Sequence, residues 1–147
     1  MTASACVGAE TYREGLFGFD IADYASARDA WSVCAEAGDY RCQFGLGILY
    51  NAGHGVPVDH IQALNWFERA AKQGSTDAAL ELGILYAIGP GDVAQDPIAA
   101  YAWILVAARD GDPVAEDRRA LMRNLLDDDE ATEAQERAKA LLDAMRH

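Results

Sequence analysis

Apolar residues recur along most of the chain with the spacing of helices. Between Ala63 and Ala71 they fall at steps of three and one, and the same steps return between Ala100 and Ala108. Such steps place apolar side chains on one stripe of a helix, whereas a strand would alternate. The pattern predicts about seven helices, over residues 22–37, 40–52, 60–73, 76–88, 97–110, 113–126 and 130–146.

The helical pattern itself repeats with a period of 36 to 37 residues. Phe67 corresponds to Trp31 one period earlier and to Ile104 one period later, and the string Leu46–Tyr50 returns as Leu82–Tyr86. The extra residue in the longer period is an insertion at Asp92. A fixed period of this length indicates helix pairs that stack on one another.

Capping residues mark the ends of the predicted helices. N-cap side chains precede five of them, at Asp39, Asp59, Ser75, Asp96 and Asp112. Glycines that can adopt a left-handed conformation stand where helices end, at Gly38, Gly74 and Gly111. Two further glycines, Gly47 and Gly83, lie inside helices, where each costs about 1 kcal/mol relative to alanine. Their recurrence predicts that a neighbouring helix passes too close for a side chain.

These motifs resemble Sel1-like repeats, which are relatives of the tetratricopeptide repeats. The string L-G-x-L-Y, followed by A-x-x-W-F-x-x-A-A-x-x-G, runs from Leu46 to Gly74, and a second copy runs from Leu82 to Gly111. The resemblance implies an all-α fold, a short α-solenoid of antiparallel helix pairs with a C-terminal capping helix. We expect an N-terminal lead-in at residues 1–19 and a solenoid at 20–147, with units near 20–38, 39–74 and 75–111 and a cap at 112–147.

The same resemblance implies a role in holding another protein or peptide. By analogy with tetratricopeptide repeats, the helices that carry L-G-x-L-Y line a concave surface. The residues of those helices that point away from the Leu/Gly/Tyr packing set are Arg41, Phe44, Ile48, Asn51, Asp77, Leu80, Ile84 and Ala87. Their apolar members form a stripe on which an amphipathic helix or an extended peptide could dock. Alternatively, Phe44 and Leu80 only close contacts between neighbouring units.

The cysteines indicate whether the protein works in an oxidising or a reducing cellular compartment. Cys34 and Cys42 stand at the end of one helix and the start of the next, and their Cys-x7-Cys spacing resembles that of secreted, cysteine-rich Sel1-like proteins of bacteria. That resemblance implies a disulfide and a periplasmic or secreted protein. The other interpretation is two reduced, buried cysteines in a cytoplasmic protein. Cys6 is either a loose free thiol or part of a lipoprotein-like cleavage site.

Charge narrows the range of partners. The chain has 24 acidic and 12 basic residues, a net charge of −12. A field of that sign disfavours nucleic acid and anionic membranes, and it favours a partner with basic residues. We expect the chain to be a monomer. The longest apolar stretch, around Ala99–Ala108, is too short to span a bilayer. Residues 1–10 show no signal peptide, so we expect any such signal to have been removed.

No catalytic or metal-binding motif emerges. His54 and His60 lack the i, i+4 spacing of a helical metal site, and the run Asp127–Glu130 is better explained by helix capping than by calcium. The sequence holds neither Gly-x-Ser-x-Gly nor Ser-x-x-Lys. We therefore expect no enzyme, cofactor or metal. The alternative functions are a hydrolase or binding protein for β-lactams or cell-wall precursors, as among cysteine-rich relatives, and a structural subunit of a larger assembly.

Overall fold

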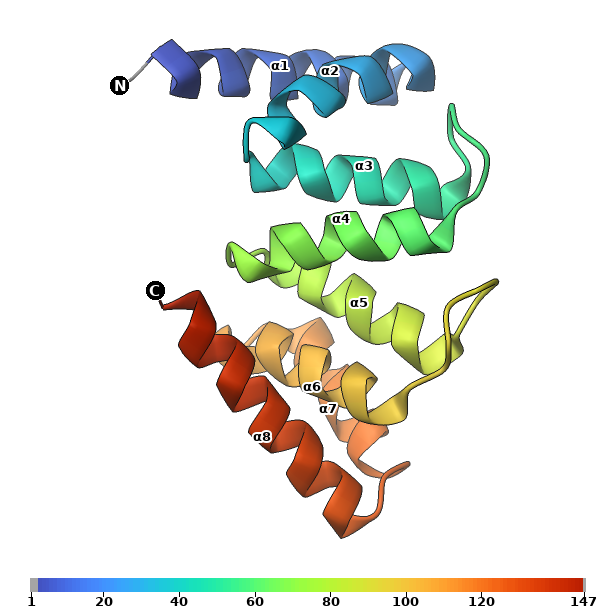
Figure 1. The fold of residues 1–147 in the computed structure, drawn as a ribbon, viewed down its shortest axis with the longest axis vertical. Coiled ribbons are helices and arrows are strands. Elements are labelled where there is room, and N and C mark those ends of the chain that lie inside the picture. Colours follow the sequence, from blue (N-terminus) through green and yellow to red (C-terminus); the bar gives the residue numbers. More distant parts are fainter. Residues whose placement is uncertain (1–2, 147) are drawn as a thin grey trace. The chain divides into compact units, whose positions relative to one another are not determined.

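Helices make up the whole of the regular structure in the computed structural model, which describes residues 3–146 and the side chains of residues 8–146. The α-helices are α1 (Ala3–Asp20), α2 (Tyr24–Glu36), α3 (Tyr40–Ala52), α4 (His60–Lys72), α5 (Thr76–Ile88), α6 (Pro97–Ala107), α7 (Pro113–Arg123) and α8 (Asp128–Met145), with a 3-10 turn, η1 (Ala108–Asp110), after α6 (Figure 1). The all-α fold class is confirmed, and every predicted helix is present. The chain divides into two compact units, Met1–Ala70 and Ala71–His147.

The first helix, α1, was not predicted from the sequence. It occupies most of the segment expected to be a lead-in, and it packs along α2 (Figure 1). Gly15 and Gly18 are buried on this helix because each lies against α2. A Cβ on Gly15 would overlap the Trp31 indole, and one on Gly18 would lie 3.0 Å from the Ala27 backbone nitrogen. Cys6 belongs to α1, but its side chain lies outside the described residues.

The predicted caps form hydrogen bonds. The five N-cap side chains accept from a backbone N–H in the first turn of the helix that follows, for example Asp96 Oδ1 from Ala99 at 3.0 Å and Asp112 Oδ1 from Ala115 at 2.9 Å. Asp127 and Glu130 form a reciprocal capping box at the start of α8. Helix capping therefore accounts for part of the acidic run, as predicted.

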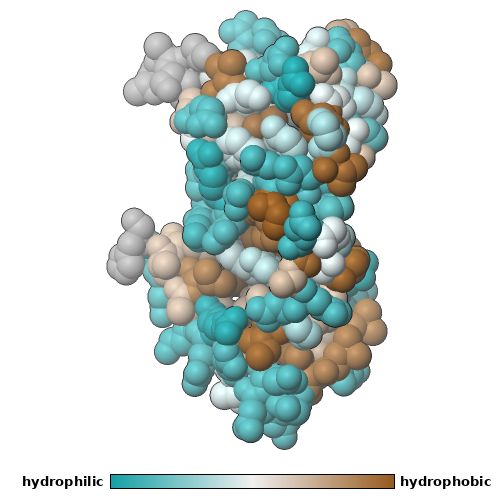
Figure 2. All heavy atoms as spheres, turned by 45° about the vertical axis from the view of Figure 1, so that its right-hand side comes forward, coloured by the Kyte–Doolittle hydropathy of each residue, from teal (hydrophilic) through white to brown (hydrophobic). Residues whose placement is uncertain are grey.

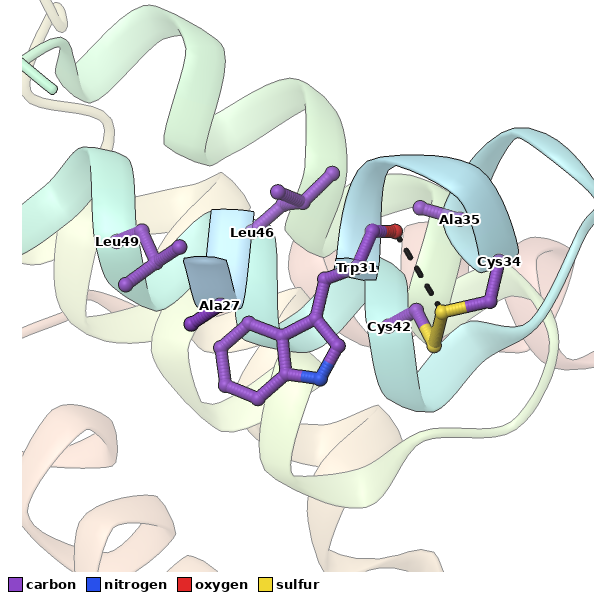
Figure 3. Packing of buried hydrophobic residues seen from close by; sticks show 7 residues of the cluster. All are labelled: Ala27, Trp31, Cys34, Ala35, Cys42, Leu46 and Leu49. Atoms are coloured by element: carbon purple, nitrogen blue, oxygen red, sulfur yellow. Dashed lines mark hydrogen bonds between the residues drawn. A yellow bond between two sulfur atoms is a disulfide. The ribbon is translucent and has the colours of Figure 1, made fainter. Parts of the chain in front are cut away.

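Trp31 is the centre of the core of the first unit. Its side chain is buried with Ala27, Leu46 and Leu49 (Figure 3), and its Nε1 donates a 3.2 Å hydrogen bond to the backbone oxygen of Tyr12 on α1. On the α3 side, a Cβ added at Gly45 would lie 2.6 Å from the ring. The indole thus fits between two helices only because each presents a glycine to it.

The glycines inside the L-G-x-L-Y motif have the predicted role. A Cβ on Gly83 would lie 2.5 Å from Cγ1 of Ile104 on α6 and 3.2 Å from the backbone oxygen of Ala100. One period earlier, a Cβ on Gly47 would overlap the ring of Phe67 on α4. Because Phe67 and Ile104 are the repeat equivalents read from the sequence, the two contacts confirm the period in three dimensions.

Helix α6 forms the core of the second unit. It is buried on nearly all sides, as expected of a helix whose whole circumference is apolar. Helices α5, α7 and α8 pack around it, and α8 contributes a stripe of small residues that includes Ala131, Ala134 and Ala138. Within the described chain, no helix is both long enough and apolar enough to cross a membrane.

Candidate functional site

An open apolar pocket of about 350 Å³ lies in the second unit, between α5, α6 and α7. We call it the α5–α7 groove; it is lined by Gly83, Ile84, Ala87 and Ile88 from α5, Ile104 from α6, Arg118, Leu121 and Met122 from α7, and Leu125 from the turn that follows α7. The floor forms because Gly83 lets α6 approach closely, so that the buried Ile104 lies directly beneath the opening. The walls are the facing sides of α5 and α7.

The walls leave large aliphatic side chains in water. Ile88 is 66% exposed, Leu121 61% and Leu125 74%. Exposed apolar residues interrupt an otherwise largely hydrophilic surface over the face shown in Figure 2. Single exposed apolar residues are ordinary, whereas several that converge on one concave site are a feature of interaction surfaces.

Arg118 is the charged residue that lines the groove, and two acidic residues precede the lining residues on α5. Glu81 is half-buried on α5, one turn before Ile84. Burial raises the pKa of the Glu81 carboxyl, the neighbouring charge of Asp77 raises it further, and the guanidinium of Arg118 acts in the opposite direction. Asp77 and Glu81 are one turn apart on the same helix, so their like charges repel. The part of α5 before Ile84 therefore carries two acidic residues, of which Glu81 is half-buried and Asp77 exposed.

Comparison with known families explains the period. The Sel1 repeat family matches residues 41–75 and 76–112. The chain is a Sel1-like repeat protein. Solved structures agree: a protective antigen of uropathogenic Escherichia coli with an SLR fold is 25% identical with a TM-score of 0.88 over 94% of this chain and 30% of that one. A Sel1 repeat protein of Oxalobacter formigenes is 28% identical with a TM-score of 0.71 over 82% of this chain and 51% of that one.

A curated relative is similar at the level of sequence. Chitin synthase regulatory factor 3 of Schizosaccharomyces pombe is 34% identical over 121 residues, which is 79% of this chain and 12% of the yeast protein. The chain thus spans only a part of each of these relatives.

In the second Sel1 repeat, the predicted residues divide between groove and rim. Ile84 and Ala87 line the α5–α7 groove, while Leu80 is half-buried and Asp77 is exposed in the first turn of α5. Sequence reasoning missed the α7 wall and Ile88. Helix α7 lacks the L-G-x-L-Y motif and was interpreted as part of a cap; it contributes Arg118, Leu121 and Met122, and the turn after it contributes Leu125.

In the first Sel1 repeat, three of the four predicted residues have internal partners. The Arg41 guanidinium donates to both carboxylate oxygens of Asp39, at 3.1 and 2.7 Å, and lies 4.5 Å over the ring of Tyr12. The rings of Phe44 and Phe67 are 5.6 Å apart. The other two residues, Ile48 and Asn51, are half-buried, and Asn51 Oδ1 accepts a 2.9 Å hydrogen bond from His60 Nδ1.

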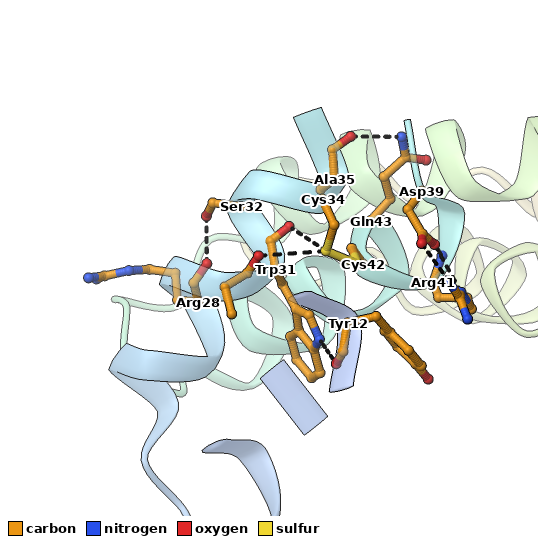
Figure 4. Close-up of a disulfide and its surroundings, with 11 residues drawn as sticks. Tyr12, Arg28, Trp31, Ser32, Cys34, Ala35, Asp39, Arg41, Cys42 and Gln43 are labelled. Atoms are coloured by element: carbon orange, nitrogen blue, oxygen red, sulfur yellow. Dashed lines mark hydrogen bonds and ion pairs between the residues drawn. A yellow bond between two sulfur atoms is a disulfide. The ribbon is translucent and has the colours of Figure 1, made fainter. Parts of the chain in front are cut away.

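Burial and hydrogen bonding shift the pKa of the Asp39 carboxyl in opposite directions. Desolvation raises it, but hydrogen bonds from Arg41 and the Cys42 backbone, with the charge of Arg41, together hold the pKa below its ordinary value. The same pairing raises the pKa of Arg41. Asp39 and Arg41 thus form a locked pair at the start of α3, next to the cysteines (Figure 4).

Cys34 and Cys42 form a disulfide between the end of α2 and the start of α3 (Figure 4). Their Cα atoms are 5.9 Å apart, and both side chains are buried. The side chain of Gln43 is buried beside them and donates a 3.2 Å hydrogen bond to the Ala35 oxygen. The bridge therefore joins helices that already pack closely, which is the arrangement that the Cys-x7-Cys resemblance implied.

His54 and His60 both contact neighbouring side chains. His54 stacks on Tyr24 with ring centroids 4.3 Å apart, and His60 is bonded to Asn51. Among the described residues, no group of three or more His, Cys, Asp or Glu side chains is placed to hold a metal ion. Trp66 is half-buried under the guanidinium of Arg69, at 4.5 Å, whereas Trp31 and Trp103 are buried in the two units.

Proposed function

We propose that this chain is a protein-binding module that accepts a segment of a partner protein in the α5–α7 groove. The observation that carries the proposal is the convergence of Ile88, Leu121 and Leu125, each more than half exposed, on one pocket with an apolar floor. Burying such side chains against a partner yields about 25 cal/mol for each Å² of apolar surface removed from water. A regulatory adaptor or scaffold is the class of function that this surface supports.

The family supports the same proposal. Sel1 repeats generally mediate protein–protein interaction, and one relative carries the name of a regulatory factor. The family match favours binding over the alternative, hydrolysis or binding of β-lactams or cell-wall precursors. We expect no turnover of a chromogenic β-lactam, and sustained hydrolysis that is lost in a Leu125→Glu variant would reverse this preference.

The proposal also includes the cellular compartment in which the protein works and the charge of its partner. The buried Cys34–Cys42 bridge supports work in an oxidising compartment such as the periplasm or the cell exterior. A net charge of −12 favours a partner with basic residues and a chain that stays monomeric. Sedimentation at rising protein concentration tests whether the chain remains a monomer.

Selection from a displayed library of random peptides tests the binding role. Selected peptides are titrated against the wild type, against Leu125→Glu in the groove, and against Val33→Glu, a matched control on α2 at a residue that is 59% exposed. We expect Leu125→Glu to weaken binding at least about tenfold, because it places a charge in the apolar contact, and Val33→Glu to leave binding unchanged. Failure to select any peptide, or equal loss in both variants, would contradict the proposal.

A further inference from the structure

We propose that a cleft beside the C-terminal end of α8 is a second binding surface, and that it takes an acidic segment of a partner protein. We call it the α8 cleft. It consists of two pockets of about 340 and 460 Å³, which adjoin because Arg109, Leu142 and Arg146 line both. Neither pocket shares a lining residue with the α5–α7 groove. The inference therefore goes beyond the proposed function and stands without it.

Positive charge gathers in the α8 cleft although the chain is acidic. Three of the 12 basic residues line it: Arg109 from η1, Lys139 from α8, and Arg146, which caps the end of α8. The carboxylates in the lining are those of Asp110 and Asp143. The cleft thus has one net positive charge in a chain of net charge −12. Because salt screens charges beyond about 8 Å, these local groups dominate what a bound ligand experiences.

Two of the three cations are available to a ligand. The side chains of Lys139 and Arg146 are exposed, and neither forms a hydrogen bond or an ion pair with any residue that the structure describes. They stand seven residues apart, so they lie about 10 Å apart along α8, with Leu142 between them on the same face. Two carboxylates of a partner can therefore each meet a separate cation, while an apolar residue between them covers Leu142.

The third cation is held in position across the cleft. Arg109 Nη2 donates a 3.0 Å hydrogen bond to the Gly74 oxygen, and Nε donates a 3.2 Å bond to Asp110 Oδ2. Nη1 lies 4.0 Å from the sulfur of Met145 on α8. A guanidinium has five N–H groups, so two remain after these three contacts. A carboxylate that enters the cleft meets a donor whose orientation is already fixed, which lowers the entropic cost of binding.

The apolar part of the lining favours a peptide over a free anion. Leu105, Leu142 and Met145 are half-buried at the cleft. Both pockets have the volume of sites that bind organic ligands. A nucleic acid is disfavoured, because the net charge of the chain and the carboxylates of Asp110 and Asp143 repel a polyanion. A short segment with an apolar residue between acidic ones satisfies both the cations and the apolar surface.

Three short fluorescent peptides test the inference. The first has a central leucine flanked by glutamates, the second has glutamine in place of every glutamate, and the third keeps the glutamates but has serine in place of leucine. Affinities are measured by fluorescence anisotropy at low ionic strength, with circular dichroism to confirm that each variant is folded. The proteins are the wild type, the cleft variant Lys139→Gln/Arg146→Gln, and the groove variant Leu125→Glu. A matched control, Arg13→Gln/Arg119→Gln, removes the same charge at two exposed residues outside the cleft.

We expect the glutamate–leucine peptide to bind the wild type at least about fivefold tighter than the glutamine peptide, and tighter than the serine peptide because leucine covers apolar surface. The cleft variant should lose the preference for glutamate, while the control and Leu125→Glu should keep it.

The inference is overturned if no peptide binds, if glutamine and glutamate peptides bind equally, or if the serine peptide binds as well as its leucine counterpart. It is also overturned if both charge-removing variants lose the preference equally, which would show that only the overall charge matters. Loss of binding in Leu125→Glu would place the peptide in the α5–α7 groove instead. Peptides selected for that groove should bind the cleft variant normally, so the two proposals fail independently.

Discussion

Replacing Cys34 and Cys42 by alanine should destabilise the protein almost entirely through the lost cross-link. The two positions correspond to Ala70 and Ala78 in the next unit, which are fully buried without a bridge. Alanine therefore suits the packing, and little cavity cost is expected. The bridge joins residues eight apart in the sequence, and closing a loop of that size lowers the entropy of the unfolded chain by an amount worth about 2.5 kcal/mol.

The assay is thermal and urea unfolding followed by far-UV circular dichroism, with and without reductant, in a Cys6→Ala background that removes the remaining thiol. For a chain of this length, about 2.5 kcal/mol corresponds to a fall in Tm of about 5–10 °C. Reductant should lower the Tm of the parent by the same amount and leave the double variant unchanged. The reasoning would be refuted if reductant left the Tm of the parent unchanged, or if the double variant were as stable as its parent.

Other substitutions test single contacts. Gly83→Ala should destabilise the protein by about 1–3 kcal/mol in urea unfolding because its Cβ meets Ile104; the opposite sign, which helix propensity alone predicts, would show that α6 can move aside. Asp127→Ala should cost about 1 kcal/mol by removing the capping box of α8, and an unchanged urea midpoint would show that the box does not stabilise the helix. Asp39→Asn tests whether ionisation of the Asp39 carboxyl stabilises the folded state. The pKa of Asp39 is lowered in the folded state, so its stabilisation is full above the unfolded value near 3.8 and disappears as pH falls through the folded pKa. The difference in stability between wild type and Asp39→Asn should therefore vanish in acid, and a difference that persisted there would contradict the assignment.

Much of the fold could be predicted because the repeat provides three coinciding signals. Apolar spacing indicated every helix from α2 to α8, N-cap residues supported five of them and helix-ending glycines three, and the structure places all seven within a few residues of the predicted bounds. Helix α1 was missed because it precedes the repeat and carries glycines where a core residue would be expected. Gly15 and Gly18 add nothing to an apolar pattern, because they have no side chain. Their role is to leave room for Trp31 and for the backbone of α2.

The candidate site was predicted only in part, for a related reason. The motif identified one wall, through Ile84 and Ala87, because a repeated helix presents the same face in each unit. The other wall comes from α7 and the turn that follows it, neither of which carries the motif. Sequence position also could not reveal that Arg41 and Asn51 have partners of their own, since Tyr12 and His60 lie on other helices.

The most direct test of the central claim is a nuclear magnetic resonance titration of the isotope-labelled protein with a peptide selected from the displayed library. The account predicts chemical-shift changes concentrated at Gly83, Ile84, Leu121 and Leu125. Smaller changes are expected on α8, and none at the residues around Cys34. Saturable binding whose shifts fall on other helices and spare these four residues would contradict it.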